Sequence, residues 1–284
     1  GTELNESSCK KQKKCTTMYT TIQYQESDDR SIVTLRLNRP DKLNAMTIEL
    51  ITELYEALCK IEEDRTCRVV ILIGNGRGFC AGADLAANSL GVGGQKWDSS
   101  KIANQKLFSR VPLKIASMPQ VVIAAVHGAC AGGGFSLALA ADMRIAGEST
   151  KMNAAFIKIG LGGCEMGISH TLPKMVGYAN ASEILMTGDM VNAEKAYRLG
   201  IVNKVVADDQ IHKEALDLAR RCTQASSLGL RLTKAQLRGS ADGMSMQTAV
   251  HAEDVSQVLC LNDEDVKEYL KEKVKKFFPS KGKL

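Results

Sequence analysis

Two glycine-rich turns are the stretches of this chain whose residue types could do chemistry. One is GRGFCAGADL (residues 76–85) and the other is HGACAGGGF (127–135). Each follows an apolar run typical of a buried strand, so each places backbone N–H groups at the end of a strand, where crevices form in α/β sheets. Glycine has no Cβ, and a helix that begins at Gly132–Gly134 directs unpaired N–H groups and its positive dipole end outward. The two turns together predict a site for an anion.

Buried strands that alternate with helices must position these turns. The sequence predicts strands at Ile32–Asn38, Val69–Ile73, Val121–Val126 and Met143–Ala146, and helices that start after Thr47, near residue 101 and at Gly132. Such alternation indicates βαβ units and a parallel sheet. Beyond about residue 190 the pattern is mainly helical, with a brief strand at Val202–Val206. We therefore predict a flexible leader (1–17), an α/β core (18–206) and a C-terminal helical subdomain (207–284).

Composition and charge exclude several classes of protein. The 284 residues are 44% apolar and 24% charged, as in a globular protein of one or two domains. The net charge of the whole chain is +5, and residues 1–17 carry +2 while residues 267–284 carry +5. Residues 18–266 therefore have a net charge of −2, so they offer no broad basic face for nucleic acid. Nine dispersed cysteines without a C-x-x-C pair predict reduced thiols, with neither a disulfide framework nor a zinc site. The uncharged run 121–141 contains three consecutive glycines, which favours strand, turn and helix over a membrane span.

Four segments, in order and correctly spaced, resemble the enoyl-CoA hydratase/isomerase, or crotonase, superfamily. They are NRPDKLNAM (38–46), GRGFCAGADL (76–85), HGACAGGGFSLALAADMRIA (127–146) and MTGDMVNAEKAYRLGIVNKVV (186–206). The resemblance implies the crotonase (ClpP/crotonase-like) fold, a spiral of ββα units followed by a helical trimerisation subdomain. It also implies an acyl-CoA thioester substrate, with no further cofactor and no metal.

The same resemblance assigns roles to individual residues. The backbone N–H groups of Ala83 and Gly133 would hold the thioester oxygen as an enolate forms, and each such donor stabilises the developing charge by roughly 3–4 kcal/mol. The substrate-binding residues would be Lys42, Leu43, Ala45, Ala81, Asp84, Leu85 and Ser136. The resemblance further implies a homotrimer or homohexamer. We predict an intracellular protein, with mitochondrion and peroxisome both left open because the final Gly282-Lys283-Leu284 approaches the peroxisomal Ser-Lys-Leu signal.

The sequence departs from the family where hydratases carry two glutamates. Ser136 occupies the first glutamate position, and Ile157 and Lys158 occupy the second. A carboxylate appears instead at Glu165, within LGGCEMGISHTLPK (161–174), where dienoyl-CoA isomerases carry an aspartate. In an apolar, glycine-lined pocket its pKa would rise, as a proton shuttle near neutral pH requires. The other interpretation is that Glu165 only interacts with a helix dipole.

Three functions follow from these residues. The leading hypothesis is double-bond isomerisation of an enoyl- or dienoyl-CoA with Glu165 as proton shuttle. The alternatives are an enoyl-CoA hydratase that adds water to 2-enoyl-CoA, and a non-catalytic acyl-CoA-binding homologue that has lost its acids. Ser136 with His170 is a weaker hypothesis for a serine nucleophile, and His127 is expected to be structural.

Overall fold

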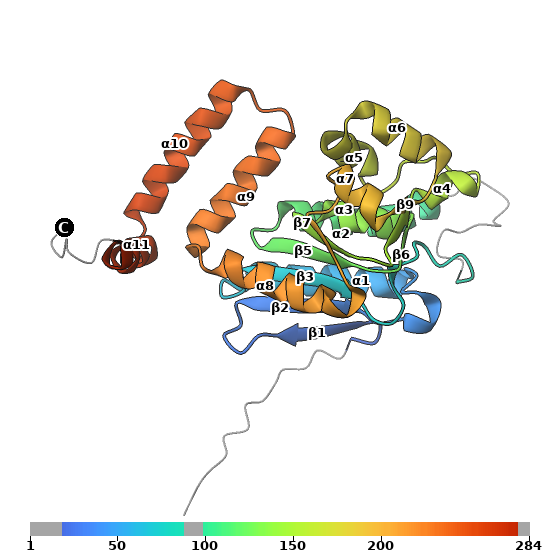
Figure 1. Ribbon diagram of the computed structural model, residues 1–284, viewed down its shortest axis with the longest axis horizontal. Coiled ribbons are helices and arrows are strands. Elements are labelled where there is room, and N and C mark those ends of the chain that lie inside the picture. Colours follow the sequence, from blue (N-terminus) through green and yellow to red (C-terminus); the bar gives the residue numbers. More distant parts are fainter. Residues whose placement is uncertain (1–18, 88–98, 278–284) are drawn as a thin grey trace, which may run out of the picture.

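The structure is a computed structural model that describes residues 19–87 and 99–277 (Figure 1). The predicted leader and the Gly282–Leu284 signal lie outside the described residues. Within the described ranges, no helix has both the length and the apolar character that crossing a membrane requires.

A twisted sheet of six strands forms the centre of the described part of the chain. Its order is β1 (Ile22–Glu26), β2 (Ile32–Leu37), β3 (Val69–Gly74), β5 (Val121–Val126), β7 (Met143–Gly147) and β10 (Lys204–Val206). The edge strand β1 pairs antiparallel with β2, and all other neighbours are parallel. The predicted parallel sheet is confirmed, whereas the antiparallel strand β1 was not predicted from the sequence.

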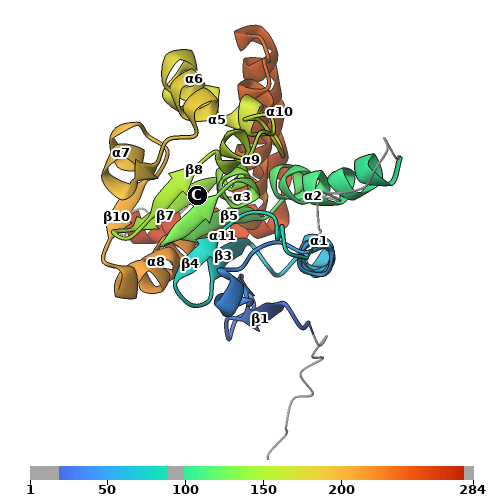
Figure 2. The same ribbon diagram turned by 90° about the vertical axis from the view of Figure 1, so that its right-hand side faces the viewer.

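Helices cover both faces of this sheet, which explains the continuous apolar runs in its strands. One face packs against α1 (Ile48–Glu63), α2 (Ser99–Ser117) and α3 (Gly133–Ala140), and the other against α8 (Ile211–Thr223). Figure 2 shows α1 and α2 side by side. Helix α1 begins as predicted, because the Thr47 side chain caps it by accepting a hydrogen bond from the Leu50 N–H at 3.2 Å.

A second, smaller sheet completes the core, and the sequence did not predict it. Its order is β4 (Gly78–Cys80), β6 (Ala129–Ala131), β8 (Lys151–Asn153) and β9 (Val191–Asn192). The expectation that strand β5 leads through a simple turn into helix α3 is therefore wrong in one detail, since β6 lies between them. Strands of two or three residues are too short to show a period in the sequence.

Together the two sheets create a repeated ββα unit. Strands β3, β5 and β7 each lie in the large sheet, and the strand that follows each one lies in the small sheet. The helix closing each unit is α2, α3 or α4 (Ala155–Lys158). This is the predicted spiral of ββα units.

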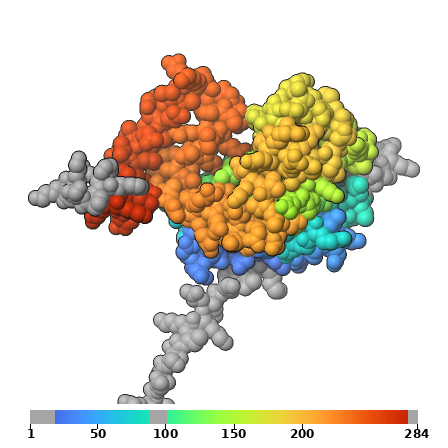
Figure 3. All heavy atoms as spheres, viewed as in Figure 1, coloured from blue at the N-terminus to red at the C-terminus, as the bar shows by residue number. Residues whose placement is uncertain are grey.

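The chain ends in helices, as predicted. Helices α5 (Ile168–Val176), α6 (Tyr178–Thr187) and α7 (Ala193–Arg198) lie between strands β8 and β10, and α9 (Ser227–Ala241), α10 (Met246–Asn262) and α11 (Glu264–Phe277) follow α8. Figure 1 shows α9 and α10 as an antiparallel pair beside the core, and Figure 3 shows that this part of the molecule projects as a lobe.

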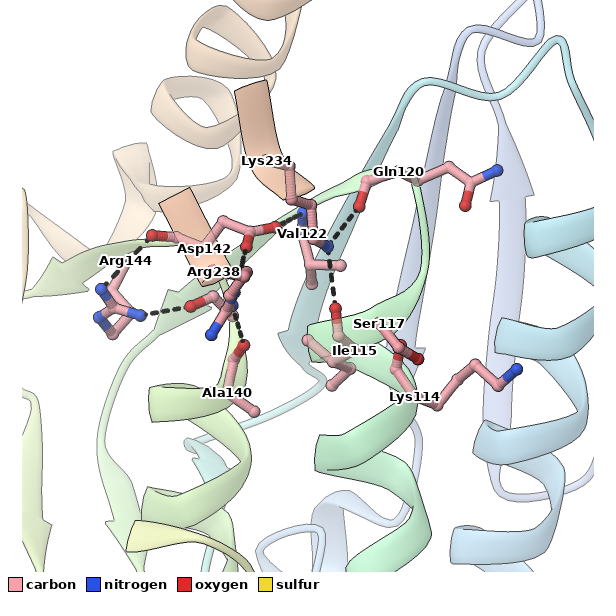
Figure 4. Close-up of polar contacts among 11 residues, drawn as sticks. Lys114, Ile115, Ser117, Gln120, Val122, Ala140, Asp142, Arg144, Lys234 and Arg238 are labelled. Atoms are coloured by element: carbon pink, nitrogen blue, oxygen red, sulfur yellow. Dashed lines mark hydrogen bonds and ion pairs between the residues drawn. The ribbon is translucent and has the colours of Figure 1, made fainter. Parts of the chain in front are cut away.

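Helix α9 is attached to the core by a buried ionic cluster (Figure 4). Lys234 is buried, and its Nζ donates to the carbonyls of Ile115 at 2.9 Å and Gln120 at 2.7 Å and pairs with Asp142 Oδ2 at 2.9 Å. Arg238, one turn further along α9, pairs with Asp142 Oδ1 at 2.7 Å. Asp142 follows α3, so this single carboxylate joins the helical subdomain to the end of the core helix.

Candidate active site

The loop after β2 is locked in place by Asn44. Leu43 and Asn44 have left-handed backbone angles, with φ of 48° and 56°. Asn44 is buried, and its Nδ2 donates to the carbonyls of Asn75 at 2.9 Å and Gly78 at 2.8 Å. These hydrogen bonds offset the energetic cost of the left-handed backbone conformation, and they hold the loop against the first glycine-rich turn.

The two segments predicted to bind coenzyme A lie side by side. Ala81 N–H donates to Leu43 O at 3.0 Å, Met46 N–H donates to Gly82 O at 2.7 Å, and Asp84 N–H donates to Met46 O at 2.9 Å. This ladder brings together Lys42, Leu43 and Ala45 from one segment and Ala81, Asp84 and Leu85 from the other. Lys42 and Leu85 are exposed, and Leu43, Ala45 and Ala81 are partly exposed, so all five can be reached by a ligand.

Asp84 differs from these neighbours because its side chain is already occupied. Its Oδ2 pairs with Arg39 at 2.9 Å, and its Oδ1 accepts from Ala87 N–H at 3.1 Å. The hydrogen bond from Arg39 holds the pKa of Asp84 below its usual value. Its carboxylate thus fixes the loop, and it caps a turn at Ala87.

The proposed oxyanion donors stand at the meeting point of the two glycine-rich turns. A Cβ on Gly82, the residue before Ala83, would come 3.5 Å from Gly133 N and 2.9 Å from Ala131 O. Within the described residues, no hydrogen bond is recorded from the backbone N–H of Ala83 or Gly133 to a protein acceptor. Neither N–H group is therefore committed to an acceptor among the described residues, and their joint action on one oxygen stays a prediction.

Methionine side chains make this corner apolar. A Cβ on Gly133 would lie 2.2 Å from Met46 Cε and 3.1 Å from Met166 Sδ, so the ends of both methionine side chains reach this position. Met46 and Met166 are both buried. An oxyanion at Gly133 would consequently sit beside low-dielectric groups, where amide dipoles act more strongly than in water.

Glu165 lies next to the same corner, just before α5. The turn is formed by two left-handed residues, Met166 with φ of 52° and Gly167 with φ of 88°. Ser136 on α3 donates from Oγ to the Glu165 carbonyl at 2.9 Å, and Met166 touches the Gly133 position. Burial raises the pKa of the Glu165 carboxyl, while a hydrogen bond from Gln105 opposes the rise. The structure thus brings Gly133, Ser136 and Glu165 together.

Gln105 is the site residue that the sequence did not reveal. It lies on α2, 60 residues before Glu165, and its Nε2 donates to Glu165 Oε1 at 2.7 Å. A lone glutamine in a mostly polar helix carries no motif, so only the packing of α2 could identify it.

The two hydratase glutamate positions hold no carboxylate in the structure. Ser136 Oγ is bonded to the Glu165 carbonyl, and Lys158 is exposed and pairs with Asp189 at 3.1 Å. Ile157, between Phe156 and Lys158, has no titratable group.

His127 and His170 form their hydrogen bonds with residues other than Ser136. His170 Nε2 contacts Asp242 Oδ1 at 2.7 Å and Lys174 Nζ at 2.6 Å, while Ser136 bonds to a carbonyl. His127 Nε2 contacts the Gly76 carbonyl at 2.9 Å, which fits its predicted structural role. A serine–histidine pair is therefore not formed by these residues.

Two cavities among the described residues lie away from Ala83, Gly133 and Glu165. One, of about 430 Å³, lies between the end of α1 and the start of α9. The other, of about 580 Å³, lies at the β3 and β5 ends beside α8. Neither of these two cavities is lined by Ala83, Gly133 or Glu165.

Known proteins match most of this chain. The profile of the enoyl-CoA hydratase/isomerase family matches residues 27–281. A probable enoyl-CoA hydratase of Mycobacterium tuberculosis is 38% identical over 231 residues, which cover 80% of each chain. A 1,2-epoxyphenylacetyl-CoA isomerase of Escherichia coli is 35% identical over 240 residues, covering 84% of this chain and 90% of that protein.

Solved structures agree with the sequence matches. The enoyl-CoA hydratase from Bacillus anthracis superposes with a TM-score of 0.84 at 27% identity, covering 90% of this chain and 97% of that one. Spiral core, helical C-terminal region and sequence matches lead to one conclusion: the chain has the crotonase fold and belongs to the enoyl-CoA hydratase/isomerase family of acyl-CoA enzymes.

Proposed function

We propose that this enzyme moves the double bond of an enoyl- or dienoyl-CoA, with Glu165 as the proton shuttle. The observation that carries the proposal is Glu165 itself: Ser136 on α3 holds its backbone carbonyl, and its carboxyl is partly buried with a raised pKa. A carboxyl whose pKa lies closer to neutrality can both accept and return a proton during turnover.

For a 3-enoyl-CoA the proposed reaction has two steps. Glu165 takes a proton from C2, and the electron pair left behind moves into the thioester carbonyl to give a dienolate. The oxyanion is held by the N–H groups of Ala83 and Gly133. Glu165 then returns the proton to C4, the carbonyl reforms, and the double bond lies between C2 and C3. Atoms and charge balance without a cofactor beyond the CoA thioester, which we propose is the sole requirement.

The segments 42–45 and 81–85 are the proposed contact for coenzyme A. Their support is the backbone ladder that aligns them next to Ala83, together with the reachable side chains of Lys42 and Leu85. Ser136 is better explained as the group that holds the Glu165 backbone than as a direct ligand of the substrate.

The hydratase function is the second candidate, favoured by the similarity to the probable enoyl-CoA hydratase of Mycobacterium tuberculosis. Hydration needs groups that activate a water molecule and protonate C2, and the two glutamate positions hold Ser136 and Ile157 or Lys158. Glu165 supplies a single carboxyl in place of that pair, so we propose isomerisation as the better fit to the residues.

The test compares wild type with Glu165→Gln on 3-hexenoyl-CoA and 3,5-octadienoyl-CoA. Loss of one proton-transfer group lowers the rate by about 10²–10⁴-fold, so we expect kcat for isomerisation to fall by that factor. Glu148→Gln, at an exposed site, is the matched control and should retain the wild-type rate. Equal rates for wild type and Glu165→Gln would remove the proposed role.

The same preparation distinguishes the other functions. Rapid hydration of crotonyl-CoA that survives Ser136→Ala would favour the hydratase. Binding of enoyl-, dienoyl- and 3-hydroxyacyl-CoA without any turnover would select the non-catalytic homologue.

We also propose that the chain assembles as a homotrimer or homohexamer through its C-terminal helices. The support is the set of apolar side chains that the projecting α9 and α10 expose.

A further inference from the structure

The two carboxyl oxygens of Glu165 differ because Oε1 accepts a hydrogen bond from Gln105. Gln105 Nε2 donates to Oε1 at 2.7 Å, and both side chains are partly buried. No hydrogen bond from a described residue to Oε2 is recorded, and Oε2 is not among the buried polar atoms that lack a partner. Oε2 can therefore meet a ligand while Oε1 is occupied.

The chemistry of an amide makes this difference functional. The –NH₂ of glutamine only donates, so it needs a lone pair on the oxygen that it faces. A protonated Oε1 would be a poorer acceptor, whereas a proton on Oε2 leaves the bond intact. The contact thus favours protonation at Oε2 in the neutral acid and stabilises the negative charge in the carboxylate.

We propose that Gln105 is a positioning residue that confines the transferred proton to Glu165 Oε2. This inference rests on the proposed proton-shuttle function of Glu165. Helix α2 supplies the amide, so the orientation of the shuttle depends on the packing of α2 against the turn before α5. Nothing in the 161–174 motif encodes this contact.

Gln105 also opposes the effect of burial on the carboxyl. Burial alone disfavours the carboxylate, and the amide N–H favours it. Replacing the amide by an apolar group would raise the pKa of Glu165 further, so less of the enzyme would hold the basic form at a given pH. A second carboxyl at position 105 would act in the same direction through like-charge repulsion.

The experiment measures pH profiles of kcat/KM and kcat for 3-hexenoyl-CoA isomerisation by wild type, Gln105→Leu and Gln105→Glu. We expect the acid limb to move to higher pH in both variants and kcat at pH 6 to fall about tenfold, because a hydrogen bond to a charged group is worth about that factor. KM should change less than threefold. Lys106→Leu, which alters the exposed neighbouring residue on α2, is the matched control and should keep the wild-type profile.

A direct titration separates this inference from the proposed function. In protein with ¹³C-labelled glutamate carboxyls, the resonance lost in Glu165→Gln identifies Glu165, and its midpoint is then measured in wild type and Gln105→Leu. An upward shift supports the role of Gln105 even if no substrate is isomerised, in which case the proposed function alone fails. An unchanged midpoint, or an equal loss of kcat at every pH, would overturn the inference.

Discussion

The Glu165 carboxyl experiences two opposing influences on its pKa, burial and a hydrogen bond from Gln105. Burial is the larger influence, so the pKa in the folded protein lies above the value in the unfolded chain. Protonation of this group then favours folding. The stability that it contributes is fully present below the unfolded pKa and is lost as pH rises through the folded pKa.

Glu165→Gln should therefore gain stability relative to wild type as pH rises. Glutamine has nearly the same shape and no charge, so it avoids the cost of burying a carboxylate. Urea unfolding of both proteins between pH 4 and pH 8 measures the difference in the free energy of unfolding at each pH. Glu148→Gln, at an exposed position, serves as the control. A Glu165→Gln difference that stays flat, or that moves in the opposite direction, would contradict the assigned burial effect.

The sequence allowed predictions for residues that lie in motifs and none for residues that depend on packing. Gly133 and Glu165 were proposed because the segments around them resemble those of the crotonase superfamily and its dienoyl-CoA isomerases. Gln105 and the structural bonds of Asn44 could not, since each partner lies 30 to 60 residues away in the chain. Asp84 was predicted to bind substrate, and only the structure identified its ion pair with Arg39.

At the scale of elements, the sequence predicted the long strands and helices better than the short ones. The buried strands β3 and β5 and the helices α1 and α8–α11 have enough residues to display an apolar run or a helical period. The small sheet consists of strands of two or three residues, and its pairing is fixed by neighbours far away in the sequence. That sheet pairs β4 with β6, so the two glycine-rich turns that continue from these strands lie next to each other because of elements that the sequence did not predict.

The link between α9 and the core gives a prediction at this scale. Lys234→Met keeps the volume of the side chain but leaves the Ile115 and Gln120 carbonyls and Asp142 Oδ2 without its ammonium. Removal of one partner of a buried ion pair costs about 3–5 kcal/mol, and we expect about 3 kcal/mol because Arg238 still pairs with Asp142. Urea unfolding measures the loss, and hydrogen exchange should show faster exchange along α9.

Arg231→Met is the matched control for this change. Arg231 is exposed on the same helix, and exposed substitutions change stability by about 0.5 kcal/mol or less. A loss below about 1 kcal/mol in Lys234→Met, with unchanged exchange in α9, would mean that the buried cluster does not hold the helix to the core.

At the scale of the whole molecule, the α9–α10 pair is incompletely covered. Val255, Val258 and Leu259 are spaced i, i+3 and i+4 on α10, so they share one face, and they are 47%, 57% and 52% exposed. Most packing of α10 against other elements involves α9 and α11, and Figure 3 shows this lobe projecting from the core. Contiguous exposed apolar side chains of this kind are typical of a protein interface.

Two glutamates on this face should separate the subunits. We expect wild type to have a mass in light scattering of three or six times the 30.7 kDa of one chain, and Val258→Glu/Leu259→Glu to shift toward one chain, because burying two unpaired carboxylates costs several kcal/mol. Gln257→Glu adds a charge at an exposed position of the same helix and should leave the mass unchanged. Because Ala83, Gly133 and Glu165 all belong to the core of a single chain, the dissociated variant also tests whether the reaction needs the assembly. A wild-type protein of single-chain mass, or a double variant that stays fully assembled, would exclude this face as the interface.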